Sequence, residues 1–132
     1  MQIIMIVIAL HALAAVFWLG TTMAMVRSNG GGAETLFRPQ MGAAMVSVLT
    51  GGALWHLIHM GGFGLYEVIL AGGALCAIAA AMVQAIGIGS RLRLLKATDD
   101  AMAVRRQFGA VHRIAGGLLA ICLICMVIAR FS

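Results

Sequence analysis

Four histidines are the side chains of this protein best suited to chemistry, because each lies within or beside a long apolar stretch. They are His11, His56, His59 and His112. An ionisable side chain is costly inside a lipid bilayer, so its presence there marks a functional site by default. Imidazole is an axial ligand of haem iron and a ligand for copper. The sequence therefore predicts a cofactor or metal centre built from histidines.

The composition predicts the elements that must position these histidines. Of the 132 residues, 63% are hydrophobic and only 10% are charged, and the mean hydropathy is +1.07. A soluble domain is nearer half apolar and about a quarter charged, and a chain this short has too much surface to bury so many apolar side chains. These values exclude an ordinary soluble domain, a disordered chain and a disulfide-stapled secreted module. We expect an all-α integral membrane protein.

The length limits the number of membrane crossings. One transmembrane helix needs about 20 mainly apolar residues, so we expect a four-transmembrane-helix bundle in a single domain, residues 1–132. The predicted spans are residues 3–26, 41–60, 65–89 and 109–130, with residues 101–107 able to extend the fourth helix along the membrane interface. The first span lacks the basic leading region of a signal peptide, so we interpret it as a retained helix.

The charged residues predict the orientation. The chain has nine Lys and Arg residues but only four Asp and Glu residues. Eight of the nine basic residues lie in or beside the first and third predicted loops, and Arg130 lies at the opposite side of the predicted bundle. The positive-inside rule places those two loops in the cytoplasm and both termini outside, in the periplasm. Because this charge excess is explained by topology, we expect the lipid bilayer as a partner and no nucleic acid.

The expected depths in the bilayer indicate which two histidines could hold one haem. A haem held by two imidazoles needs one histidine from each of two facing helices at comparable depth. At about 1.5 Å per residue, His11 and His56 lie at similar depth, and His59 lies about one turn nearer the outer surface. Small neighbours such as Gly52 leave room for a flat porphyrin. We predict His11 and His56 as axial ligands, with His59 as the alternative or a supporting residue.

His112 lies near the cytoplasmic end of the fourth span, too far away to join that pair. It is a candidate ligand for a second haem with a methionine partner, a hydrogen-bond donor to a propionate, or an interface residue. A homodimer would be a further way to complete a site at His112. Each histidine also has a plainer interpretation, as a hydrogen-bonded packing residue.

The sulfur-containing residues favour packing over chemistry. The ten methionines are scattered and fit the role of apolar gap fillers. Cys122 and Cys125 match a Cys-x-x-Cys pattern, but they lack the strand–helix setting of a redox pair. Copper handling remains the alternative function, since His and Met are suitable ligands. Its ligands would come from His11, His56, His59, Met1, Met5 and Met60.

Three short motifs carry a resemblance to a known superfamily. They are the stretch from His11 to Trp18 and Gly20, the Leu49-Thr50-Gly51 step, and the closing segments 105–108 and 128–131. The chain resembles the superfamily of small four-helix bacterial membrane proteins that includes the copper resistance protein D domain and the HemJ-type protoporphyrinogen oxidases. The resemblance implies a multi-pass protein of the bacterial inner (cytoplasmic) membrane. From the oxidase branch it implies haem b with His11 as the ligand on the first helix, and it places Trp18 in the same motif.

One departure separates the chain from the oxidase branch, which is similar but carries a lysine early in the third helix. Residues 65–69 contain none, and the single lysine is Lys96. We therefore expect a cytochrome b-like electron-transfer protein with one or two haems, linked to quinol in the membrane and to a redox partner outside. The chain has no nucleophile–base set and no carboxylate pair, which argues against a hydrolase. A haem-dependent oxidoreductase and a pure electron carrier both fit these residues.

Overall fold

The computed structural model describes residues 1–59, 61–97 and 99–132, which are helical with short connections and no strand. The helices are α1 (Gln2–Arg27), α2 (Ala33–Ile58), α3 (Leu65–Gly89), the short α4 (Leu92–Ala97) and α5 (Ala101–Phe131). Four of these helices are long and apolar enough to cross a membrane. The predicted all-α class with four such helices is confirmed.

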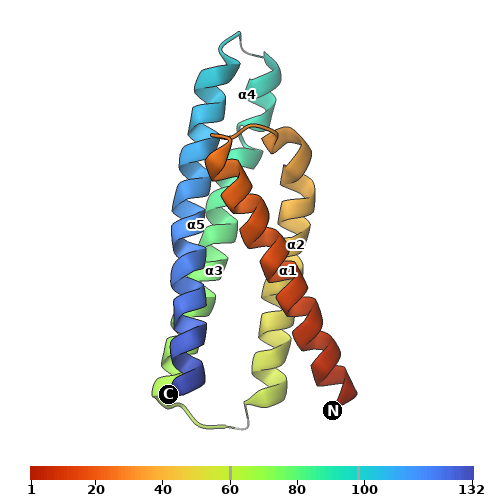
Figure 1. Cartoon of the computed structure of the whole chain (residues 1–132), viewed down its shortest axis with the longest axis vertical. Helices are drawn as coiled ribbons and strands as arrows, with labels where there is room; N and C mark the ends of the chain where they lie inside the picture. Colours follow the sequence, from red (N-terminus) through yellow and green to blue (C-terminus); the bar gives the residue numbers. More distant parts are fainter. Residues whose placement is uncertain (60, 98) are drawn as a thin grey trace.

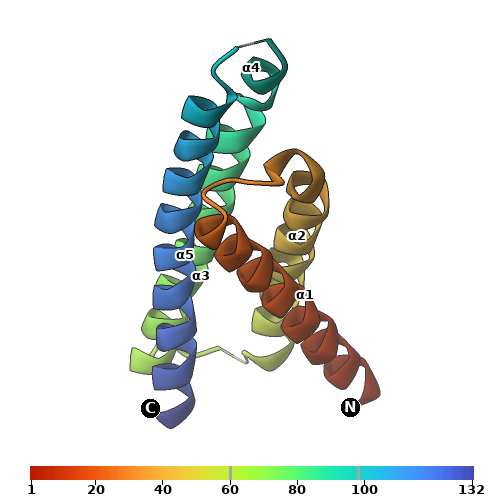
Figure 2. The ribbon, with the colours of Figure 1, turned by 45° about the horizontal axis from the view of Figure 1, so that its top comes forward.

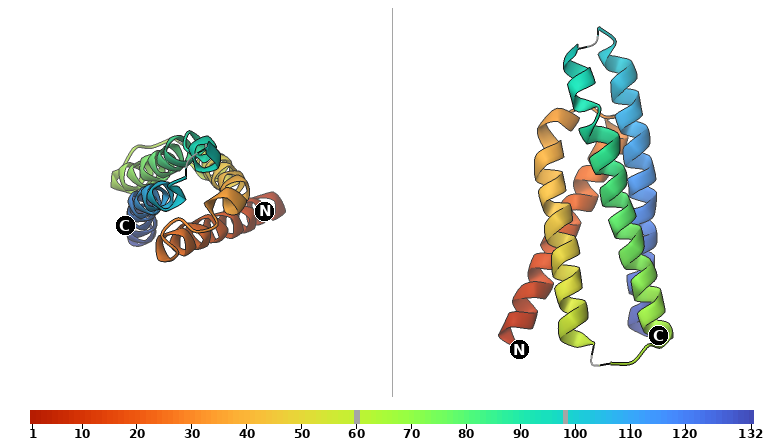
Figure 3. Two further views of the ribbon diagram at one scale, coloured as in Figure 1. Left: turned by 90° about the horizontal axis from the view of Figure 1, so that it is seen from above. Right: turned by 180° about the vertical axis from the view of Figure 1, so that it is seen from behind.

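The four long helices form two pairs (Figure 1). Helix α1 packs on α2, and α3 lies beside α5 along most of its length. Both termini and the segment 61–64 lie at one end of the bundle, whereas α4 and the 28–32 connection lie at the other. The two pairs approach each other toward the α4 end and separate toward the termini (Figures 2 and 3). The bundle is therefore closed at one end and splayed at the other.

Two helices extend beyond their predicted limits. Helix α2 begins at Ala33, eight residues before the expected start, and contains Pro39. Proline cannot donate a backbone hydrogen bond to the carbonyl four residues earlier, on Thr35, and Thr35 is exposed. Helix α5 begins at Ala101 and runs unbroken into the fourth span, with the Asp100 side chain accepting a hydrogen bond from the Ala103 backbone N–H. Met60, the predicted end of the second span, lies outside the described residues.

The α1–α2 connection is fixed against α5. Gly30 has φ +85°, and a Cβ there would collide with the carbonyl oxygen of Arg105. Only glycine combines this left-handed backbone with so close an approach. The Arg105 guanidinium also donates two hydrogen bonds to Glu34, at 2.7 and 3.2 Å. This bidentate pair joins the start of α2 to α5 at the α4 end.

Small side chains form much of the core. One buried cluster at the centre contains Trp18, Ala44, Ala80, Ala115 and Leu119. A second, nearer α4, contains Met25, Ala33, Ile88 and Phe108. Small residues allow close backbone packing between membrane helices. Among the glycines of α3, Gly87 leaves the least room toward α5, since an added Cβ there would lie 2.8 Å from Val111 Cγ2.

This contact gives a matched test of helix packing. We expect Gly87→Ala to be less stable than Gly72→Ala by about 1–3 kcal/mol, because only the first substitution overpacks the contact with α5. A Cβ at Gly72 meets nothing within 4 Å, and both substitutions gain the same helix propensity. Thermal or denaturant unfolding in detergent measures the difference. Equal stabilities would contradict the packing described here.

Candidate functional site

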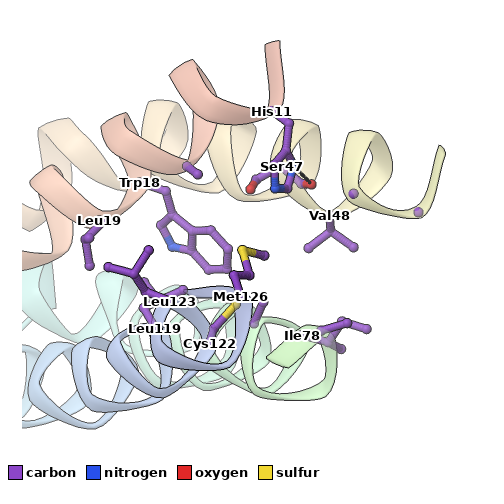
Figure 4. A pocket seen from close by; sticks show the side chains of 15 residues that line it. His11, Trp18, Leu19, Ser47, Val48, Ile78, Leu119, Cys122, Leu123 and Met126 are labelled. Atoms are coloured by element: carbon purple, nitrogen blue, oxygen red, sulfur yellow. Dashed lines mark hydrogen bonds between the residues drawn. The ribbon is translucent and has the colours of Figure 1, made fainter. Parts of the chain in front are cut away.

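An apolar cavity of about 260 Å³ lies between the two helix pairs. Side chains from α1 and α5 point into it from opposite walls, with His11 and Trp18 on one side and Cys122 and Met126 on the other (Figure 4). Gly51 on α2 also lines it. The cavity forms where the two pairs begin to separate, so the splayed arrangement of the bundle creates it.

A second cavity of about 230 Å³ adjoins the first. His11, Gly51 and Met126 line both cavities. The second cavity adds an aromatic and titratable group, consisting of Trp55, His59 and Tyr66. His11 therefore lies at the junction of the two cavities.

The ring of His11 is anchored through one nitrogen. Its Nδ1 lies 2.9 Å from the Ser47 carbonyl oxygen and 3.1 Å from Thr50 Oγ1. The carbonyl can only accept, so Nδ1 carries the proton, and Nε2 keeps a lone pair with no hydrogen-bond partner in the part of the chain that the structure describes. Gly51 allows this approach, since a Cβ there would lie 3.2 Å from His11 Cε1.

His59 lies between two aromatic rings just beyond the end of α2. Its ring stacks on Trp55, with centroids 4.5 Å apart and planes inclined by 11°, and on Tyr66 at 5.7 Å and 16°. Its Nε2 lies 3.3 Å from Glu67 Oε1, a contact that favours a proton on Nε2. Its Nδ1 is buried and has no partner among the described residues. His59 thus resembles His11, with one nitrogen beside an acceptor and the other unpartnered.

The remaining predicted site residues lie in different places. Trp18 and Gly52 line the first cavity. His56 is exposed and lines neither of the two cavities. His112 is buried and lies in a separate hydrogen-bond network. The structure therefore brings His11 and His59 to one site, and it brings neither His56 nor His112 there.

That network crosses all four long helices. The Trp18 indole N–H on α1 donates to Gln84 Oε1 on α3 at 2.6 Å, and Gln84 Nε2 donates to Thr22 Oγ1 at 2.9 Å. Gln40 on α2 lies 3.2 Å from Thr22 Oγ1 and 3.1 Å from His112 Nε2 on α5. All five side chains are buried. Both nitrogens of His112 are engaged, because Nδ1 lies 2.8 Å from the Phe108 carbonyl.

Several residues of these sites were not predicted from the sequence, among them Met126, Tyr66 and Gln40. Met126 follows Cys122 by four residues, so a helical face joins them, but the methionines were interpreted as packing residues. Tyr66 is the single tyrosine and is next to Glu67. Gln40 lies four residues before Ala44 and seven before Ser47, and all three are buried. The spacing of Gln40 from these two small residues places it on the same helical face, and this spacing could have indicated a buried glutamine.

Comparisons with protein-family models, with curated proteins and with solved structures find no match to this chain.

The network gives a stability test. We expect Gln84→Leu to lower the free energy of unfolding by about 1–3 kcal/mol, because the Trp18 indole N–H and the Thr22 hydroxyl lose a buried partner. The matched control is Gln107→Leu, which removes an exposed amide that accepts from Arg91. Denaturant unfolding in detergent compares the two. A Gln84→Leu protein as stable as the control would show that the network contributes little.

Proposed function

We propose that this chain is a b-type haem-binding protein of the bacterial inner membrane that transfers electrons, in which His11 and His59 would hold the haem iron. One observation carries the proposal. Two imidazoles line adjoining cavities, and each has one nitrogen beside an acceptor and one nitrogen without a partner among the described residues. Haem supplies one-electron chemistry when bound.

The surroundings of the two rings suit such ligands. A metal-binding histidine normally donates its other ring N–H to a carbonyl or carboxylate, which fixes the tautomer and the ring orientation. The Ser47 carbonyl has this role for His11, and Glu67 has it for His59. The two adjoining cavities fall together within the usual size of cofactor pockets, about 300–1,000 Å³. The walls of both cavities are mainly apolar, and a low dielectric around a haem helps to set its redox potential.

The choice of His59 over His56 as the second ligand follows from the exposure of His56. Sequence spacing favoured His56, but its exposed position supports His59 instead. Met126 is a further candidate, because it lines both cavities with His11. A His–Met pair would raise the redox potential relative to a pair of histidines.

Superfamily membership and membrane orientation form part of the proposal. Thr50 and Gly51, from the Leu-Thr-Gly step, both lie against the ring of His11, which supports kinship with the small four-helix proteins that the sequence resembles. The basic residues of α4 and its flanking segments support a cytoplasmic α4 end and periplasmic termini. The site would then lie in the outer half of the membrane, where lipid-soluble quinol is the natural electron donor.

Copper handling is the second candidate function. Two sulfur side chains, Cys122 and Met126, line the same cavity as His11. Thiolate and thioether ligands select copper(I). This set differs from the outer methionines expected from the sequence, and it would leave the ring cluster of Trp55, His59 and Tyr66 in the second cavity without a role.

An absorption spectrum of the detergent-purified protein, oxidised and then reduced with dithionite, distinguishes the two functions when metals are measured on the same sample. Stoichiometric iron with a sharp Soret band and low-spin visible bands would support the haem proposal. Stoichiometric copper without haem would favour the second candidate. A colourless, metal-free protein from cells well supplied with haem would contradict both.

Single histidine variants test the ligand assignment. We expect His11→Ala to lose most bound haem and His59→Ala to lose the low-spin spectrum, because each removes one imidazole that would hold the haem iron. His56→Ala is the control and should keep the wild-type spectrum. If His56→Ala loses that spectrum and His59→Ala keeps it, the assignment from sequence spacing is correct and ours is wrong.

Two glycines of α2 test the anchoring of His11. An added Cβ at Gly51 lies 3.2 Å from His11 Cε1, whereas one at Gly42, which lines neither cavity, meets nothing within 4 Å. We therefore expect Gly51→Ala to reduce the haem content and shift the Soret band, and Gly42→Ala to change neither. Haem per chain, measured from the reduced spectrum, provides the comparison. Identical haem binding by both variants would contradict a close approach of the His11 ring.

A further inference from the structure

We propose that His112 and Gln40 form a buried proton-binding site, in which the imidazole takes up one proton and the Gln40 amide turns to match. The site is separate from the cavities, so it stands whether or not the chain binds haem. The proposal follows from which group must donate and which must accept in each hydrogen bond of the network.

The direction is set at Trp18. An indole N–H can only donate, so the Gln84 amide must present its oxygen to Trp18 and its nitrogen to Thr22. The Thr22 hydroxyl donates to the Trp18 carbonyl at 2.8 Å. Thr22 Oγ1 therefore acts as an acceptor toward its other neighbours.

Both nitrogens of His112 consequently face acceptors. Gln40 Nε2 donates to Thr22 Oγ1 at 3.2 Å, which leaves Gln40 Oε1 at 3.1 Å from His112 Nε2. On the other side, the Phe108 carbonyl lies 2.8 Å from His112 Nδ1. Only the protonated imidazole donates from both nitrogens. The arrangement is that of an imidazolium.

The neutral imidazole can be satisfied at the same place. It keeps Nδ1–H on the Phe108 carbonyl, so its Nε2 then needs a donor. A half turn of the Gln40 amide supplies that donor and moves the amide oxygen toward the threonines. Thr21 Oγ1 lies 3.2 Å from Gln40 Nε2 and now donates to helix carbonyls at 2.9 and 3.0 Å. Rotating this hydroxyl toward Gln40 then gives the amide oxygen a donor, so both His112 Nε2 and Gln40 Oε1 are hydrogen-bonded in the neutral form.

Among the described residues, no charged side chain of the neighbouring helices serves as a partner for the protonated His112 ring. Arg27 on α1, Arg38 on α2 and Arg113 on α5 are exposed, and Glu34 pairs with Arg105. On α3 the one charged residue is Glu67, at the opposite end of the helix. In the stretches 1–59, 61–97 and 99–132, no charged side chain hydrogen-bonds or ion-pairs with His112. Proton binding therefore depends on the neutral partners, above all on Gln40.

Nitrogen-15 NMR of the full chain in detergent micelles tests the site. On lowering the pH, we expect the ring nitrogens of His112 to change from the neutral Nδ1–H form to the doubly protonated form. The Gln40 side-chain amide should shift with the same midpoint, and the Gln84 amide, held by Trp18, should shift little. A single neutral form of His112 over the whole pH range of the folded protein would overturn the proposal. So would a titration of His112 that leaves the Gln40 signals unchanged.

Substitution of Gln40 gives an independent comparison. We expect Gln40→Leu to weaken proton binding by His112 at least about tenfold, because the imidazolium loses its Nε2 acceptor. Gln107→Leu, at an exposed glutamine, should leave the titration unchanged. Gln40→Glu offers an acceptor that cannot donate when ionised, so it should strengthen proton binding. Equal titrations of His112 in the wild type and in Gln40→Leu would contradict the proposal. If Gln40→Leu does not fold, the comparison is made between the wild type and Gln40→Glu, and equal titrations of His112 in these two proteins would contradict the proposal.

Discussion

The hydrogen-bonded network of Trp18, Gln84, Thr22, Gln40 and His112 is the interaction on which the rest of the bundle depends. A helix embedded in lipid has no water to satisfy its polar side chains, so each must find a partner inside the protein. These five residues satisfy one another only if all four long helices are present. The network therefore specifies which helices meet and at which height, something that apolar contacts in an apolar solvent specify poorly.

The network also determines where the bundle can open. On its α4 side, the pairs are joined by the Glu34–Arg105 ion pair and by the Gly30 turn against α5. On its other side, the pairs separate and leave the two adjoining cavities. Trp18 belongs to both regions, since its indole donates to Gln84 while its ring lines the first cavity. The two cavities of the candidate site thus lie next to the tightly packed, hydrogen-bonded part of the bundle that holds Trp18 in place.

The sequence predicted the coarse structure well and the site only in part. Hydropathy was enough to predict four long apolar helices, because a helix that can span a membrane needs about 20 mainly apolar residues, and such stretches are visible in the sequence. The register of the second site histidine was not accessible in this way. Helix α2 ends at Ile58, and His59 has an extended backbone with ψ 111°, so helical spacing from His56 does not predict where its ring lies. Gln40 was missed because the second helix was expected to start just after it, at residue 41, which placed Gln40 in the preceding loop and not on the helical face of Ala44 and Ser47.

The pairing of the helices follows the order of the chain. Helix α1 packs on the next helix, α2, and α3 packs on α5 with only the short α4 between them. Each pair is therefore a hairpin of consecutive segments, which can form as soon as its second helix has been synthesised. Membrane helices fold first as separate units and then associate, and contacts between neighbouring segments form faster than distant ones. The first hairpin can be complete while the second is still being synthesised, and the space between the two is enclosed only when they dock.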